Sequence, residues 1–290
     1  MNPLDASRTA LATSLMRALH SRHDPAPLLD DDWGDRLVPE TFRAAVLAQA
    51  LRANAAYADV IIRTRYAEDA LQAAVARGAV QYVVVGAGFD SFAYRRPAWA
   101  ADLAIYEIDH PATQAMKRQR LAACGADVSA SVEFIAADLS AETLGSALAR
   151  SSFQPGRLTF FSWLGVSMYL AREANLSALE AMASCAPAGS ELVFNYVDQA
   201  ALAPGAQVGE AFSKLKTAVS SAGEAFLSGF DPAMVGEQLE AAGLELLEDL
   251  DGEQAVARYD PSGANGLRSA AAAHIVHARV ASLTAPRMPY

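Results

Sequence analysis

The fold of this chain is decided by the stretch Tyr82-Val83-Val84-Val85-Gly86-Ala87-Gly88-Phe89-Asp90-Ser91. Its first four residues are a continuous apolar run rich in β-branched side chains, which is typical of a parallel strand buried on both faces. The glycine at position 86 permits a tight turn, and the glycine at position 88 lets a ligand approach the backbone closely. We therefore expect a buried strand that ends in a ligand-binding turn.

Strands and helices alternate after this stretch. Short apolar runs predict further strands at residues 104–108, 132–135, 158–162, 192–196, 244–247 and 274–280, and helical spacing predicts helices at 111–124, 172–186 and 233–242. This alternation is typical of βαβ units, which form a parallel sheet with right-handed crossovers. We expect an α/β fold with a mainly parallel seven-stranded sheet flanked by helices, and ligands beyond the carboxyl ends of the strands.

The chain before this body has a helical character. Apolar spacing predicts a helix at residues 9–21. Residues 39–76 are long enough for two or three helices, with Thr41 as a candidate cap and Gly78 as the stop.

A break separates these helical segments. Residues 23–39 contain prolines and a run of aspartates, so they predict a loop that is either a lid or a solvated connector. We expect a helical N-terminal cap or lid over residues 1–78 and one Rossmann-like domain over residues 79–290.

The composition excludes several classes of function. Hydrophobic residues make up 52% of the 290 residues, too many for a disordered chain. Acidic residues outnumber basic ones by 33 to 23, and a net charge of −10 is unsuited to neutralising nucleic-acid phosphates. No segment reaches the roughly 18 uninterrupted apolar residues that a membrane span requires. We expect neither a nucleic-acid partner nor a membrane.

The cysteines and the N-terminal residues indicate a cytoplasmic protein. Cys124 and Cys185 are too few for a disulfide framework, and no Cys/His cluster has the spacing of metal ligands. Residues 1–20 contain charged side chains and no compact apolar core, so we expect no signal peptide. A metal site is not expected either.

Acidic residues follow the next two predicted strands. Glu107 and Asp109 end the second strand, about 20 residues after Gly88, where a carboxylate can accept hydrogen bonds from both hydroxyls of a ribose. Asp138 follows the third strand, where it can accept a hydrogen bond from an adenine amino group while Leu139 packs on the ring. The simpler alternatives are a solvated strand-end acid and, for Asp138, a helix cap.

The turn itself discriminates between nucleotide ligands. The dinucleotide fingerprint has a third glycine where this chain has Ser91, and Asp90 places a carboxylate where a pyrophosphate would be repelled. Polar positions at three successive strand ends fit the adenosine half of S-adenosylmethionine better than a nicotinamide dinucleotide. A nicotinamide-dependent oxidoreductase is the alternative.

A set of motifs along the chain points to one family. They are Arg8-Thr9-Ala10, Trp33-Gly34-Asp35-Arg36, Arg63-Thr64-Arg65-Tyr66 with Asp69, Gly86-Ala87-Gly88-Phe89-Asp90 with Tyr94-Arg95, Tyr106-Glu107-Ile108-Asp109-His110-Pro111, Asp138-Leu139 and Gly165-Val166-Ser167-Met168-Tyr169-Leu170. With these motifs the chain resembles, over nearly its whole length, the class I S-adenosylmethionine-dependent methyltransferases of the leucine carboxyl methyltransferase type. It is most similar to a bacterial branch described as O-methyltransferases of polyketide biosynthesis. The motifs are specific together and not singly.

The resemblance implies a role for each matched residue. Arg63 matches an arginine that pairs with the cofactor carboxylate, which a guanidinium does well through bidentate hydrogen bonds, and Arg8 falls near a basic residue of the same site. In the cofactor loop the matches are Gly86, Gly88 and Asp90. Asp109 matches the ribose ligand in preference to Glu107, and Asp138 with Leu139 matches the adenine site.

Two positions qualify these roles. Some family members have a glutamate where this chain has Leu164, so any polar cofactor contact from that side chain is absent. By spacing alone, Arg63 and Arg65 would form charge pairs with Glu68 and Asp69 on a helix surface.

The implied activity is methyl transfer from S-adenosylmethionine to a carboxylate or hydroxyl of a small molecule, such as a polyketide-type metabolite. The protein mainly has to align the donor and the acceptor for an in-line displacement. A carboxylate acceptor needs no general base, whereas a hydroxyl benefits from one. Tyr169 either orients the acceptor oxygen as a catalytic residue or is a core aromatic, and His20 or His23 is a first guess for a base. A non-catalytic cofactor-binding module is a third interpretation.

Overall fold

The strand predicted from residues 82–85 forms β1 (Gln81–Val85) at the centre of a sheet. The computed structural model describes residues 3–45, 48–126, 132–221 and 225–282. Within these residues the sheet has seven strands, and the others are β2 (Ala104–Asp109), β3 (Val132–Ala136), β4 (Thr159–Trp163), β5 (Glu191–Val197), β6 (Leu244–Asp251) and β7 (Ala273–Val280). Each predicted strand is confirmed, with bounds that shift by a few residues.

The topology of the sheet locates the site. The strands lie in the order β3-β2-β1-β4-β5-β7-β6. Neighbours from β3 to β5 are parallel, whereas β7 runs antiparallel to both β5 and β6. The order along the chain reverses between β1 and β4, and open α/β sheets bind ligands at such a switch point, outside the carboxyl ends of the strands.

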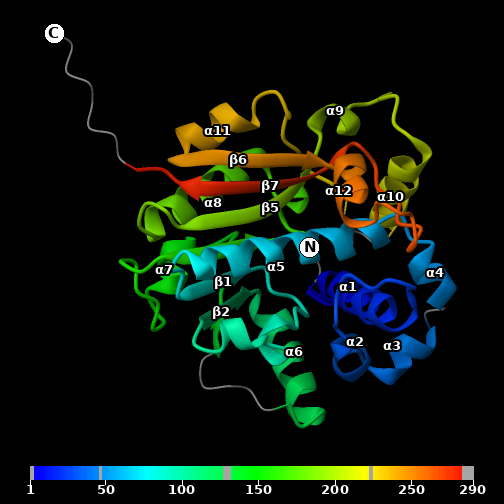
Figure 1. The fold of residues 1–290 in the computed structure, drawn as a ribbon, viewed down its shortest axis with the longest axis horizontal. Coiled ribbons are helices and arrows are strands. Elements are labelled where there is room, and N and C mark those ends of the chain that lie inside the picture. Colours follow the sequence, from blue (N-terminus) through cyan, green and yellow to red (C-terminus); the bar gives the residue numbers. More distant parts are fainter. Residues whose placement is uncertain (1–2, 46–47, 127–131, 222–224, 283–290) are drawn as a thin grey trace.

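Helices connect the strands and cover both faces of the sheet (Figure 1). They are α1 (Pro3–His23), α2 (Trp33–Leu37), α3 (Glu40–Ala45), α4 (Ala48–Arg52), α5 (Tyr57–Ala76), α6 (Pro111–Ala123), α7 (Leu144–Leu148), α8 (Arg172–Cys185), α9 (Gln199–Leu202), α10 (Glu210–Ser221), α11 (Val235–Ala241) and α12 (Gly252–Tyr259). Single 3-10 turns occur at η1 (Phe92–Tyr94), η2 (Ala98–Ala100) and η3 (Ser167–Tyr169).

The apolar run of β1 is explained by burial on both faces, because successive strand residues point to opposite sides. Tyr82 and Val84 belong to an apolar cluster that also includes residues of α1, α5 and α12. Val83 and Val85 belong to a second apolar cluster, on the other face, that includes residues of α7, α8 and α11. A strand in this position leaves no face for polar side chains at these four residues.

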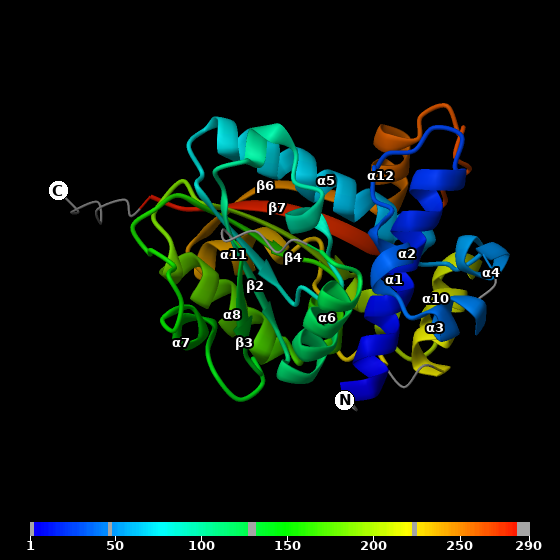
Figure 2. The same cartoon turned by 90° about the horizontal axis from the view of Figure 1, so that it is seen from below.

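The helical N-terminal region gathers at one end of the molecule. Both Figure 1 and Figure 2 show α1 to α4 together with α10 and α12 at that end. Gly78 follows the end of α5 with a φ of 105°, as predicted. The division into units at residue 78 stays a prediction.

Two predictions for this region are wrong. Residues 33–37 of the predicted loop form α2. Trp33 is buried at its start, and the backbone N–H of Trp33 donates to Oδ1 of Asp31 at 3.1 Å. Thr41 is not a cap, since it lies inside α3, which begins at Glu40. The cavity described next is closed partly by α1 and α5 from this region.

Candidate functional site

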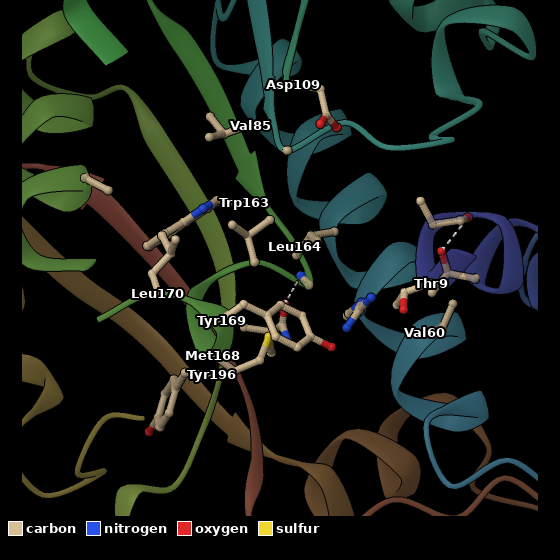
Figure 3. A pocket seen from close by; sticks show the side chains of 18 of the residues that line it. Thr9, Val60, Val85, Asp109, Trp163, Leu164, Met168, Tyr169, Leu170 and Tyr196 are labelled. Carbon is tan, nitrogen blue, oxygen red and sulfur yellow. Dashed lines mark hydrogen bonds between the residues drawn. The ribbon is translucent and has the colours of Figure 1, made fainter. Parts of the chain in front are cut away.

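A cavity of about 980 Å³ opens at the carboxyl ends of β1, β2, β4 and β5. Figure 3 shows Val85 and Asp109 on the strand-end side, Met168 and Tyr169 after β4, and Thr9 and Val60 on the helices opposite. The cavity therefore lies where the topology of the sheet predicts a ligand site.

The glycine turn after β1 forms part of the cavity wall. Gly86 has a φ of 71°, and a Cβ at this position would lie 2.5 Å from Cγ2 of Val166, so only glycine fits. Gly88 and Asp90 do not line the cavity among the described residues. The N–H of Gly88 donates to the Asp109 carboxylate, and the Asp90 carboxylate accepts from a backbone N–H two residues on at 2.9 Å. These two residues shape the turn, and their contact with a cofactor stays a prediction.

Asp109 ends β2 and faces the cavity. Its carboxylate accepts hydrogen bonds from the N–H groups of Gly88 and, at 2.6 Å, of His110. Burial raises the pKa of Asp109, and these hydrogen bonds oppose the rise. A carboxylate has about four lone-pair sites, so both oxygens can still accept hydrogen bonds from a diol.

Glu107, the alternative to Asp109, has no access to this cavity. Its side chain is only 1% exposed, and its Oε2 lies 2.5 Å from Nζ of Lys117. Burial raises the pKa of Glu107, and the charge of Lys117 opposes the rise. Glu107 therefore belongs to a buried ion pair under the site.

Asp138 and Leu139 line the cavity just after β3. Oδ1 of Asp138 accepts hydrogen bonds from the N–H of Ser140 at 3.0 Å and from its hydroxyl at 2.6 Å, and these bonds lower the pKa of Asp138. The next helix, α7, is capped by Thr143 instead, so the interpretation of Asp138 as a helix cap is wrong. The lowered pKa keeps the Asp138 carboxylate ionised at the edge of the cavity.

Arg63 projects from α5 into the cavity beside the turn after β4. A Cβ at Gly165 would lie 2.7 Å from Nη2 of Arg63, so the glycine leaves room for the guanidinium. Within the described ranges Arg63 makes no hydrogen bond or ion pair. Burial lowers its pKa, and the charge of Asp59 opposes this. The surface-pair interpretation is thus wrong for Arg63 but right for Arg65, which pairs with Asp69.

Tyr169 lies on η3, and its hydroxyl points across the cavity toward α5 (Figure 3). Its ring packs on Phe226, with centroids 5.8 Å apart, in an apolar cluster with Met168 and Leu215. Tyr169 is therefore both an aromatic of a core cluster and a residue of the cavity wall. Arg8 also lines the cavity and is exposed.

Asp59 is a cavity residue that the sequence analysis missed. It lies one helical turn before Arg63 on α5, and its Oδ1 accepts a hydrogen bond from the Ser269 hydroxyl. Burial raises the pKa of Asp59 to about 6, although the hydrogen bond from Ser269 and the charge of Arg63 oppose the rise. Ser269 is 210 positions away in the chain, so no local pattern could have revealed the contact.

The histidines suggested as a base do not reach the cavity. His20 is fully buried in α1, with Nδ1 2.7 Å from Oδ2 of Asp24 and with Nε2 accepting from the N–H of Leu28 at 2.7 Å. Burial lowers the pKa of His20. Neither His20 nor His23 lines the cavity, so this guess is wrong.

A buried network that the sequence analysis also missed ties α1 to the glycine turn. Arg17 donates from Nη2 to the carbonyl of Phe89 and from Nε to Oδ2 of Asp31, both at 2.8 Å. The hydroxyl of Ser91 donates to the same aspartate oxygen at 2.6 Å. Ser91 stands where the dinucleotide fingerprint has its third glycine. Its hydroxyl links the glycine turn to Asp31.

Two further kinds of site are absent from the described part of the chain. No group of three or more His, Cys, Asp or Glu residues there has a geometry that could hold a metal ion. No helix there is both long enough and apolar enough to cross a membrane.

Known proteins share this sequence pattern. The profile of the leucine carboxyl methyltransferase family matches residues 10–183. YktD of Bacillus subtilis, whose name places it among S-adenosyl-L-methionine-dependent methyltransferases, is 28% identical over 96% of this chain and 99% of its own length. A Mycolicibacterium smegmatis protein with a name of the same class is 32% identical over 70% of this chain and 71% of its own.

The fold also has a close counterpart among solved structures. The crystal structure of a DUF574 family protein from Streptomyces avermitilis superposes with a TM-score of 0.60. It covers 83% of this chain and 91% of that chain, at 15% sequence identity. At this identity the likeness concerns the fold alone.

Proposed function

Since the chain belongs to the leucine carboxyl methyltransferase family, and is thus an S-adenosylmethionine-dependent methyltransferase, we propose that it methylates an oxygen of a small molecule. The oxygen belongs to a carboxylate or a hydroxyl, and a polyketide-type metabolite is the expected class of acceptor. Membership of this methyltransferase family contradicts both alternatives, which were a nicotinamide-dependent oxidoreductase and a non-catalytic cofactor-binding module.

One observation carries the proposal. The cavity holds an arginine without a protein partner in the described ranges, Arg63, and two carboxylates at strand ends, Asp109 and Asp138. S-adenosylmethionine has the complementary order of groups, with a carboxylate at one end, a ribose diol in the middle and an adenine amino group at the other end. The residues present therefore fit this cofactor.

The proposed contacts follow from the chemistry of each group. Arg63 holds the cofactor carboxylate through bidentate hydrogen bonds, with the exposed Arg8 near it. Asp109 accepts from the ribose hydroxyls, and Asp138 accepts from adenine while Leu139 covers the ring. The turn with Gly86, Gly88 and Asp90 brings the backbone close to the cofactor.

Bound S-adenosylmethionine supplies a methyl group that its sulfonium has already activated. The protein residues then contribute mainly position, since reacting atoms about 3–3.5 Å apart and in line gain most of the rate. Tyr169 is suited to orient the acceptor oxygen because its hydroxyl faces the cavity from the turn after β4.

Calorimetric titration with S-adenosylhomocysteine tests the cofactor site first. We expect saturable binding at one site per chain. Incubation with tritiated S-adenosylmethionine and a panel of oxygen, nitrogen and thiol acceptors then tests the transfer. Label that appears only on nitrogen or sulfur would overturn the assignment to oxygen.

Asp109→Ala is expected to weaken binding of S-adenosylhomocysteine by about 1–3 kcal/mol, or roughly 5- to 150-fold, the cost of lost charged hydrogen bonds. The control is Asp102→Ala, an exposed aspartate just before β2 at the opposite edge of the sheet. Unchanged affinity of the Asp109 variant would refute the ribose assignment.

A further inference from the structure

The cavity continues past Arg63 toward α10 and α12 into a lobe with one apolar wall. Ala56, Met168, Tyr169 and Leu215 belong to a single apolar cluster and line this part of the cavity. Figure 3 shows the hydroxyl of Tyr169 pointing across the cavity toward α5, the helix that carries Val60 and its neighbour Asp59. This lobe lies beyond the residues proposed to hold the cofactor, so it is the place for the acceptor.

Among the residues that the structure describes, the lobe contains one carboxylate, that of Asp59. Its single hydrogen bond among the described residues comes from Ser269 to Oδ1, and it makes no ion pair with Arg63. The second oxygen is thus without a protein partner in the described ranges. Because Asp59 lies one helical turn from Arg63, it faces the same side of α5.

We propose that the methyl acceptor is an apolar molecule that presents a hydroxyl, and that Asp59 is the general base that removes its proton. This inference rests on the proposed function, and it selects the hydroxyl from the two acceptor groups considered there.

The charges in the lobe argue against a carboxylate acceptor. Such an acceptor would place a second negative charge beside Asp59, and like charges so close cost several kcal/mol. Arg63 and Arg8 would not neutralise it, because both are assigned to the cofactor carboxylate. A carboxylate acceptor also has no use for a base, whereas a hydroxyl does.

The proposed step balances in atoms and electrons. The acceptor oxygen forms a bond to the methyl carbon while the carbon–sulfur bond breaks and its electron pair stays on sulfur. The hydroxyl proton passes to the Asp59 carboxylate. The products are a methyl ether, S-adenosylhomocysteine and a protonated Asp59, which returns its proton to solvent.

The surroundings of Asp59 define its pH dependence. Arg63 from its own helix and Ser269 act on Asp59 directly, and the other titratable groups on this side of the cavity are Tyr169 from η3, Arg8 from α1 and His274 from β7. The contributions of α10 and α12 to the lining, Leu215, Gly252 and Ala255, do not titrate. Since burial raises the pKa of Asp59 to about 6, the rate should rise with pH through about 6 and fall away below it.

Asp59→Asn should lower kcat for a methylated hydroxyl compound by roughly 10²- to 10⁴-fold, the usual contribution of a general base. Its affinity for S-adenosylhomocysteine should stay within a factor of about three. Ser269→Ala keeps the carboxylate but removes a hydrogen bond that lowers its pKa, so the acid limb of the pH profile should move to higher pH. The matched control is Asp69→Asn on the same helix, which removes only the pair with Arg65 and a hydrogen bond from Tyr259.

Two measurements do not depend on turnover. In the presence of S-adenosylhomocysteine at pH 8, the wild type should bind 2-naphthol at least about tenfold more tightly than 2-naphthoate, and Asp59→Asn should abolish this preference. In ¹³C-carboxyl spectra, the aspartate signal that Asp59→Asn removes should titrate near the raised pKa of about 6.

Several results would overturn the inference while the proposed function survives. They are tighter binding of 2-naphthoate, binding of neither probe, an Asp59 signal that titrates near the ordinary value of about 4, or unchanged kcat in Asp59→Asn. Loss of S-adenosylhomocysteine binding by the wild type would instead overturn the proposed function. The two failures are therefore distinguishable.

Discussion

Lys117→Met is expected to lower the free energy of unfolding by about 3–5 kcal/mol, the cost of leaving a buried charge without its partner. Nζ of Lys117 lies 2.5 Å from Oε2 of Glu107, and both side chains are 1% exposed. Methionine fills most of the lysine volume, so packing changes little. The loss should appear in urea denaturation as a lower midpoint with an unchanged slope.

The same variant should show a pH dependence of known sign. Burial raises the pKa of Glu107 above its unfolded value, and Lys117 opposes the rise, so the variant raises that pKa further. A group with a raised folded pKa costs stability as the pH rises through that pKa. The destabilisation by Lys117→Met should therefore be larger at pH 8 than at pH 5.

A double variant separates the ion pair from a general effect on packing. Glu107→Leu added to Lys117→Met removes the orphaned carboxylate and should recover most of the lost stability. A single variant that costs less than about 1 kcal/mol, or equal costs at both pH values, would contradict the interpretation of this pair.

The strands were predictable because their burial leaves a local signature. β1 is buried on both faces, so each of residues 82–85 must be apolar. α2 leaves no such signature, because it is defined by contact with α1. A Cβ at Gly34 would lie 2.3 Å from the backbone oxygen of Ser14, a closeness that becomes visible only in the fold.

α12 was missed although a local signal existed. Asp251 and Gln254 form a reciprocal capping box at its start. The helix is only eight residues long and begins with glycine, so its apolar spacing is too short to recognise. Short helices after the fifth strand escaped prediction for the same reason.

Some residues of the site could likewise be predicted from the sequence, and others could not. Asp109 and Asp138 were predictable because parallel strands bring their carboxyl ends to one edge whatever the details of packing. The place of Asp59 in the cavity could not be predicted, because it is set by a helix that crosses this edge and by Ser269, which is distant in sequence. His20 illustrates the reverse error, since it has the chemistry of a base but spends both ring nitrogens on Asp24 and Leu28.

Arg63→Met is expected to weaken binding of S-adenosylhomocysteine by about 2–5 kcal/mol, or roughly 30- to 5,000-fold, because the ligand carboxylate would lose a desolvated charge partner. Stability should not fall, since Arg63 makes no hydrogen bond or ion pair within the described ranges. Burying an unpaired guanidinium costs free energy that methionine does not. Calorimetry and thermal unfolding together measure both effects.

The ligand offers an internal control for this variant. 5′-Methylthioadenosine keeps the adenosine part but lacks the amino-acid carboxylate, so Arg63→Met should leave its affinity nearly unchanged. Arg65→Met is the matched protein control, because Arg65 lies on the same helix and pairs with Asp69 instead. An equal loss of affinity for both ligands would mean that Arg63 shapes the cavity and does not hold the carboxylate. A fall in stability with unchanged affinity would mean that the guanidinium supports the fold. The proposed cofactor site would then have no cation for the cofactor carboxylate.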